Sequence, residues 1–186
     1  MSTKDQWWTY DFSVAALDAC RRQADRIHTV DTVVDTVNQI YAESMDSFGI
    51  TYLGTLGEWA IGAYLKLPLQ KIGRGVGERD YDFKCGGVTI EVKAKNGWGK
   101  ALFLKNKDQK ATFIAFCSVT APNRVVVYGF TTRETFQKVA VWDSKLKRPA
   151  WSLDVERLMP ISQLKEIIEV EKAREREPDT PALSVL

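Results

Sequence analysis

The sequence predicts an α/β fold, in which helices cover both faces of a mixed, twisted sheet of about four or five strands. Three observations lead to it. Two runs of alternating polar and apolar residues flank Gly86-Gly87, which is the pattern of a two-residue β-hairpin. Residues 112–119 and 124–130 are apolar runs of strand length, and the first is continuous enough for a central strand covered on both sides. Apolar residues recur at helical spacing in the segments before the hairpin.

Composition limits the class of protein. A chain of 186 residues, 45% hydrophobic and 27% charged, is the length of one domain and ordinary for a globular protein. Its formal charge of +2 does not indicate a partner. Three cysteines without C-x-x-C spacing argue against a disulfide framework and a zinc ribbon, and imply a reducing compartment. Without a signal peptide or an apolar run of about 18 residues, we expect a cytoplasmic protein and no membrane partner.

Two amphipathic helices are expected before the hairpin. The first covers residues 11–28, and Asp31 is expected to cap the second. Packing on the sheet is the favoured role for both helices, ahead of a dimer contact or a grip on DNA. The apolar stripes are Leu17, Cys20, Ala24 and Ile27 in the first helix, and Val34, Val37, Tyr41 and Met45 in the second.

A third helix is predicted over residues 54–67, where Pro68 ends it. Thr55 and Glu58 have the spacing of a capping box, in which the glutamate side chain returns to the backbone N–H of the first residue. The glycines and alanines of this segment make a slender helix, as expected of one that lies close against a sheet.

The hairpin register follows by counting outward from its turn. With Gly86-Gly87 as the two turn residues, Cys85 pairs with Val88, and Asp82 lies directly opposite Glu91. Opposed side chains have Cβ atoms roughly 5 Å apart, and like charges at that distance are destabilising. Something must therefore offset the repulsion between these two carboxylates.

A hard divalent cation is the best candidate for that role. Two carboxylates can ligate Mg²⁺, with water completing its octahedron. Lys93 lies two residues after Glu91 and therefore on the same strand face, so its ammonium points into the same site. The pattern is two acids and a lysine around a metal.

These residues resemble a known family. Asp82 followed by Glu91-Val92-Lys93 is similar to the D…(D/E)-x-K signature of the PD-(D/E)XK nuclease superfamily, and the resemblance covers residues 54 to about 131. Tyr81 stands where the signature has proline, at a position that varies widely in the superfamily. Together with the chain length, this resemblance predicts a single nuclease-like domain over residues 1–186. Its parts are a helical extension at 1–50, a restriction-endonuclease-like core at 51–140 and a flexible tail at 172–186.

The resemblance also implies a function, a Mg²⁺-dependent DNA nuclease that hydrolyses phosphodiester bonds, with Mn²⁺ as an alternative metal. Asp82, Glu91 and the Val92 carbonyl would ligate the metal. Lys93 would orient the attacking water and stabilise charge. Glu58 has a second interpretation, weighted equally with the cap, in which it points from its helix toward the two acids. Small size and the lack of a motor motif favour an endonuclease, with structure-specific cleavage as an option.

Positive charge is concentrated around this site. Seven lysines lie between Lys84 and Lys110, against only Glu91 and Asp108. A solvated lysine-rich surface and a phosphate-binding face explain this equally well. The candidate DNA contacts are Lys95, Trp98, Lys100, Lys105 and Lys107, together with Gln109, which the resemblance suggests.

Two rival functions remain open. One is a nucleic-acid-binding or assembly module that keeps the nuclease fold without catalysis. The other is a structural domain in which Asp80 pairs with Lys93 across a surface charge ladder. The opposed carboxylates argue against both. DNA is the expected partner, and a homodimer is left open.

The remaining segments receive brief predictions. Residues 101–110 are ambiguous between strand and helix, and Pro122-Asn123 is a turn. Thr131 and Glu134 have capping-box spacing for a helix to about residue 139. Residues 142–158 are expected to be irregular, and Ser162 is expected to cap a final helix.

Overall fold

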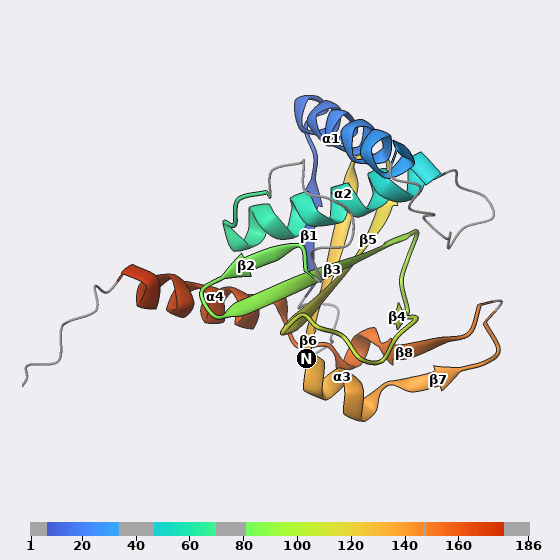
Figure 1. The fold of residues 1–186 in the computed structure, drawn as a ribbon, viewed down its shortest axis with the longest axis vertical. Helices are drawn as coiled ribbons and strands as arrows, with labels where there is room; N and C mark the ends of the chain where they lie inside the picture. The colour runs from blue at the N-terminus through green and yellow to red at the C-terminus, as the bar shows by residue number, and fades with distance from the viewer. Residues whose placement is uncertain (1–6, 34–46, 70–80, 147, 177–186) are drawn as a thin grey trace, which may run out of the picture.

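The structure is a computed structural model that describes residues 7–33, 47–69, 81–146 and 148–176. It is an α/β protein with a five-stranded mixed sheet and a smaller three-stranded sheet, as Figure 1 shows. The elements in chain order are β1 (Trp8–Asp11), α1 (Val14–Val33), α2 (Ser47–Leu65), β2 (Phe83–Cys85), β3 (Val88–Asn96), β4 (Ala101–Leu104), β5 (Phe113–Ala121), β6 (Arg124–Thr132), α3 (Arg133–Val139), β7 (Val141–Asp143), β8 (Ala150–Asp154), the short 3₁₀ helix η2 (Val155–Arg157) and α4 (Ile161–Arg176).

The predicted fold class is confirmed. The main sheet has the order β1-β6-β5-β3-β2, in which β3 and β5 are parallel and every other pair is antiparallel. The run predicted as a central strand forms β5, which is buried over residues 113–119. Pro122-Asn123 turns the chain into β6 as expected. Strand β1 was not anticipated, because its pairing with β6 joins residues more than a hundred positions apart.

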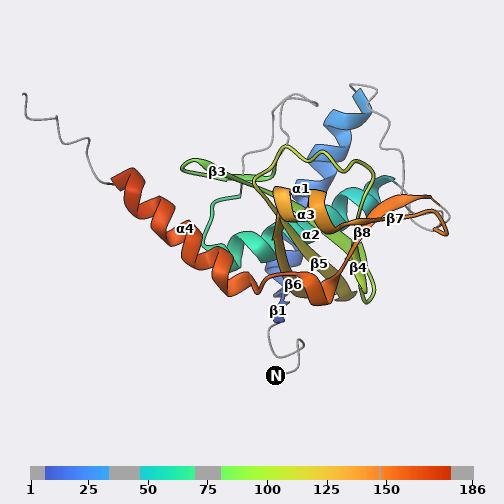
Figure 2. The same cartoon turned by 90° about the horizontal axis from the view of Figure 1, so that it is seen from below.

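Helices α1 and α2 lie on one side of the main sheet, while α3 and the small sheet lie on the other (Figures 1 and 2). Helix α2 lies very close to β3 and β5. A Cβ built on Gly57 would lie 2.9 Å from both the Ala94 Cβ and the Cys117 Sγ. Only glycine allows this approach, and it brings the next residue, Glu58, to the sheet.

The start of α2 overturns one prediction. The helix begins at Ser47 instead of residue 54, so Thr55 lies in its interior. The Thr55 hydroxyl donates to the Thr51 carbonyl at 2.9 Å, a bond within the helix. The capping box with Glu58 was therefore wrong, because no free helix N-terminus exists at Thr55. Glu58 has no capping role.

The N-terminal helices also differ from expectation. Helix α1 continues to Val33, so Asp31 lies within it and does not begin a second helix. The stripe predicted for that second helix, from Val34 to Met45, falls outside the described residues. Within the described ranges, no helix is both long and apolar enough to cross a membrane.

The small sheet has the order β4-β8-β7. It settles the ambiguity at residues 101–110 in favour of a strand, β4. It also shows that the irregular structure expected for residues 142–158 was wrong, because β7, β8 and η2 lie there. Strand β8 pairs with β4 about fifty residues earlier in the chain, and such a partner cannot be seen in a local pattern.

The last two helices begin close to where they were predicted. The cap of α3 is Thr132, whose hydroxyl accepts from the Thr135 N–H at 3.0 Å, one residue after the predicted Thr131. Helix α4 begins at Ile161, which places Ser162 inside its first turn. It continues to Arg176, so the tail predicted from residue 172 is helical over its first five residues.

Helix α4 also contacts the turn of the β2–β3 hairpin. The Gly86 N–H donates to Glu175 at 2.8 Å, and the Gly87 N–H donates to Glu171 at 3.3 Å. The Lys172 ammonium donates to the Leu65 carbonyl at 3.1 Å, at the end of α2. The helix thus connects the β2–β3 turn to the helix on which Glu58 lies.

Two helical glycines provide a matched test of this packing. Gly57→Ala is expected to lower the free energy of unfolding by about 1–3 kcal/mol, because the new methyl group overlaps β3 and β5. Gly54→Ala, where a Cβ meets no atom within 4 Å, is expected to raise it by roughly 0.5–1 kcal/mol. Urea denaturation measures both. Equal effects of the two substitutions would contradict the close approach.

Candidate active site

The observed hairpin register agrees with the prediction up to its last pair. Cys85 pairs with Val88, and Phe83 pairs with Ile90. The ladder then ends, because the Asp82 N–H donates to the Ile90 carbonyl at 2.8 Å and does not continue the pairing. Asp82 is therefore not placed as the ladder partner of Glu91. The prediction that Asp82 lies directly opposite Glu91 in the ladder was therefore wrong, because the pairing ends at Phe83 and Ile90.

The Asp82 carboxylate takes the place of the missing strand. Its Oδ2 accepts from the Val92 N–H at 2.6 Å. Among the described residues, β3 pairs only with β5 beyond Ile90, so this bond satisfies a backbone donor on the open edge of β3. The N–H and C=O of one strand residue point to the same edge. The Val92 carbonyl therefore points to the edge where the Asp82 carboxylate lies.

Glu91 and Lys93 lie on either side of Val92 in the sequence. Their side chains share one face of β3, and the Val92 side chain lies on the opposite face. The Lys93 Nζ forms an ion pair with the Glu91 Oε1. The two side chains are 19% and 38% exposed for Glu91 and Lys93, respectively, so solvent reaches the ammonium more easily than the carboxylate. The E-x-K part of the predicted site is thus assembled on one strand.

Glu58 approaches the same place from α2. The pKa of Glu58 is raised to about 7, mainly by burial and also by the negative charge of Glu91, while the positive charge of Lys93 opposes the shift. With the cap excluded, this electrostatic contact favours the second interpretation of Glu58, in which it belongs to the site.

Asp82 experiences the same environment. Burial is the main cause that raises the pKa of Asp82 well above its ordinary value, and the charges of Glu91 and Glu58 add to it. The Val92 N–H and Lys93 act in the opposite direction. The charge of Glu91 thus opposes ionisation of both Asp82 and Glu58, and the Lys93 ammonium partly offsets it. A cation bound here would remove much of that cost.

The available donors suit a hard divalent cation. Asp82, Glu91 and the Val92 carbonyl offer oxygen atoms, which Mg²⁺ and Mn²⁺ prefer over nitrogen or sulfur. In the described part of the chain, no three His, Cys, Asp or Glu side chains form a metal-holding group of their own. A metal at this site would therefore take two carboxylates, a backbone carbonyl and water, which is the ligand set that the sequence suggested.

The predicted DNA contacts fall into two groups. Lys95 lies on the Glu91 face of β3, with its Nζ 5.7 Å from the centre of the Phe103 ring. Trp98, at the end of β3, is 66% exposed. Lys100 is exposed just beyond it. Lys95 thus lies on the strand that carries Glu91, and Trp98 and Lys100 follow that strand in the chain.

The second group lies in the connection between β4 and β5. The Lys107 Nζ is 4.2 Å from the centre of the Trp151 ring, so this side chain packs against the small sheet. Lys105 is exposed at the end of β4. The Gln109 side-chain amide donates to the Asn106 carbonyl within the same connection. The contact of Gln109 with phosphate or water, which the resemblance suggests, stays a prediction.

The loop that presents Trp98 is held by Tyr128, a residue that sequence reasoning did not select. The Gly99 N–H donates to the Tyr128 hydroxyl at 2.9 Å, and the Gly97 N–H donates to the Val119 carbonyl at 2.8 Å. Tyr128 lies on β6, far from this loop in sequence, and no spacing indicates the contact. Both bonds fix the backbone on either side of Trp98.

Comparison of the chain with protein-family models, with curated proteins and with solved structures finds no match in any of the three.

The raised pKa values predict how stability depends on pH. The pKa of Glu58 rises from its ordinary value of 4.5 to about 7 on folding, so the folded state binds this proton more tightly. In chelator, the free energy of unfolding should fall as pH rises from about 4.5 to about 7, by at most about 3 kcal/mol. Asp82 acts in the same direction.

Denaturation across this pH range with the parent and Glu58→Gln provides the check. The glutamine variant should show a flatter profile, because it has no proton to lose at this position. A parental slope in Glu58→Gln would show that Glu58 is not the buried carboxylate responsible.

Proposed function

We propose that this protein is a Mg²⁺-dependent DNA endonuclease with a catalytic set of the PD-(D/E)XK type. One observation carries the proposal. The Asp82 carboxylate binds the N–H of Val92, the residue between Glu91 and Lys93. The isolated acid and the E-x-K group, separated in sequence by the hairpin, are thus joined at one open strand edge.

Each residue has a role that follows from its surroundings. Asp82, Glu91 and the Val92 carbonyl would hold the metal, which would stabilise charge on the scissile phosphate and activate a water molecule. Lys93, paired with Glu91, is a fixed positive charge that orients the water and stabilises the transition state. Glu58, with a pKa raised to about 7, is suited to exchange a proton near neutral pH.

The surroundings support a nucleic-acid substrate. Lys95 and Lys100 add positive charge along β3, and the exposed Trp98 offers a ring that can contact a base or sugar. The three cysteines are buried and free, which supports a reducing, cytoplasmic location.

The direct test is incubation of the purified protein with plasmid, linear and branched DNA, in Mg²⁺ or in chelator. Cleavage should require the metal, and nicked or linear plasmid should appear if the enzyme cuts internally. Asp82→Asn is the control, because it keeps an acceptor for the Val92 N–H but removes a charged ligand. If no DNA is cut, or if Asp82→Asn cuts as fast as the parent, the proposal fails.

Lys93 should act in catalysis and not in binding. Lys93→Met is expected to bind DNA in Ca²⁺ nearly as well as the parent, but to lose about 10² or more in single-turnover rate in Mg²⁺. The matched variant is Lys100→Met, which removes an exposed lysine outside the ion pair. It should weaken binding and reduce the salt slope by about one unit. A parental rate in Lys93→Met would refute the catalytic assignment.

Glu58 should affect the rate without being needed for folding. Glu58→Gln is expected to lower kcat by about 10² or more and to remove the pH dependence that Glu58 contributes near pH 7. Its Tm should stay close to that of the parent or rise. An unchanged rate together with an unchanged pH profile would remove Glu58 from the mechanism.

A further inference from the structure

A second aromatic site lies on the small sheet, away from the carboxylates. Trp142 on β7 pairs with Trp151 on β8, which in turn pairs with Leu104 on β4. Paired residues lie on the same face of a sheet, so these three side chains form one row. We call Trp142, Trp151 and the nearby Lys107 the tryptophan surface.

The row runs from the core into solvent. Leu104 is buried, Trp151 is partly buried, and Trp142 is 47% exposed. The two indole rings meet nearly edge to face, with their centres 5.4 Å apart and an angle of 62° between them. Trp142 is therefore fixed by its neighbour while part of its ring stays open. The β7–β8 hairpin that carries it projects away from α1 and α2 (Figure 1).

Positive side chains lie at the tryptophan surface and in the segments that flank it. The Lys107 Nζ is 4.2 Å from the centre of the Trp151 ring, within the range of a cation–π contact. The described part of the hairpin and its approach also carry three exposed cations, which are Lys138, Lys145 and Arg148. They outnumber the one carboxylate of this stretch, Asp143, which accepts from the Lys145 N–H at 3.0 Å.

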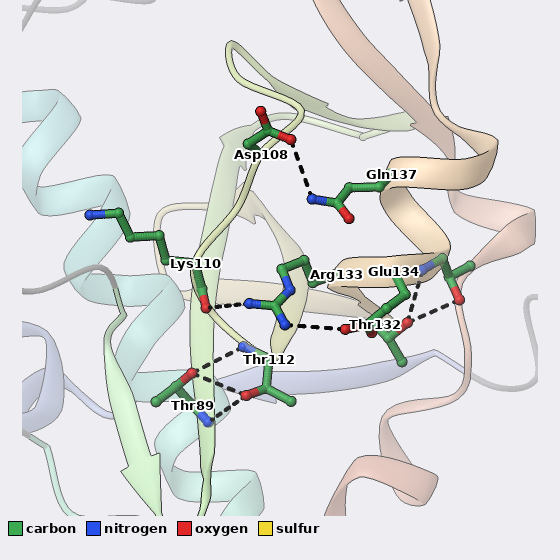
Figure 3. Close-up of polar contacts among 9 residues, drawn as sticks. Thr89, Asp108, Lys110, Thr112, Thr132, Arg133, Glu134 and Gln137 are labelled. Carbon is green, nitrogen blue, oxygen red and sulfur yellow. Dashed lines mark hydrogen bonds and ion pairs between the residues drawn. The ribbon is translucent and has the colours of Figure 1, made fainter.

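The connection that carries Lys107 is fixed at its far end, as Figure 3 shows. Thr112 exchanges two hydrogen bonds with Thr89, at 3.0 and 3.2 Å, and Arg133 donates to the Lys110 carbonyl at 3.3 Å. Asp108 accepts from the Gln137 amide at 3.4 Å. Thr89 precedes Glu91 by two residues on the same strand, so this connection links the tryptophan surface to the strand that carries Glu91.

We propose that the tryptophan surface binds an unpaired strand of DNA, with a base stacked on Trp142 and phosphates near the surrounding cations. An aromatic ring beside positive charge is the combination that recognises single strands, because every unpaired base offers a flat face. Bases inside a duplex do not offer that face. The inference rests on the proposed nuclease function and adds its substrate class, which is DNA with an unpaired segment.

A second copy of this chain is a less suitable occupant. Strand β7 is an edge strand of the small sheet, so a copy could pair with it. It has only three residues, and Lys145 and Arg148 follow it in the same hairpin. Short edges and nearby charges are the features that discourage edge-to-edge pairing.

The test measures binding without cleavage, in chelator. Fluorescence anisotropy of labelled oligo(dT) and of a labelled duplex is followed with the parent, Trp142→Ala, Trp142→Phe and Val141→Thr. Val141 is the control, because it is 65% exposed on the opposite face of the same strand. Thermal unfolding verifies that each variant folds.

Trp142→Ala should bind oligo(dT) about 10-fold more weakly, with duplex binding changed less than twofold. Trp142→Phe should keep most of the affinity, and Val141→Thr should match the parent. The inference is overturned if Trp142→Ala binds oligo(dT) like the parent, or if it changes only the oligomeric state in sedimentation.

The outcome is separable from that of the proposed function. Oligo(dT) binding that depends on Trp142, in a protein that cuts no DNA, would refute the nuclease and leave a single-strand binding surface. Metal-dependent cleavage with oligo(dT) binding that is unaffected in Trp142→Ala would keep the nuclease and refute this surface.

Discussion

The hydrogen bond from the Val92 N–H to the Asp82 carboxylate is the contact on which the site depends. It forms because the β2–β3 pairing stops at Phe83 and Ile90. Beyond Ile90, this edge of β3 has no strand partner among the described residues. The Asp82 carboxylate then accepts the Val92 N–H, as the backbone carbonyl of a paired strand would. This places Asp82 near two other acids, Glu58 and Glu91. Burial is the main cause of the raised pKa of Asp82, and the charges of Glu91 and Glu58 add to it. Because the strand pairing stops there, the Asp82 carboxylate and the Val92 carbonyl lie at the same edge of β3.

The parts of the fold that sequence reasoning recovered are those specified by neighbours in the chain. The glycine pair set the register from Cys85 to Phe83, and the apolar run at β5 indicated a central strand. Strand β1 and the small sheet were missed, because each depends on a partner far away in sequence. The start of α2 was missed because Gly49, Thr51 and Gly54 weaken its helical signal, and packing against the sheet overrides that weakness.

The candidate site shows the same division. Asp82, Glu91 and Lys93 lie on one hairpin, so spacing was enough to group them. Glu58 lies on another element, and its role could be separated from capping only once the helix was seen to begin at Ser47. Tyr128 and Trp151, which position Trp98 and Lys107, come from distant strands and have no local signature. The sequence thus identified the charged groups of the site. It did not identify Tyr128 and Trp151, the aromatic residues that contact the Trp98 loop and Lys107.

The contacts of α4 with the β2–β3 turn have a consequence for how the chain matures. Glu171 and Glu175 accept the two turn amides, and Lys172 binds the end of α2. Helix α4 is synthesised after every strand of both sheets. While the chain is still on the ribosome, the hairpin with the acids lacks these partners. The hairpin that carries Glu91 and Lys93 therefore reaches its full hydrogen bonding only when residues 161–176 have emerged, so the proposed site is completed after every strand of both sheets has been made.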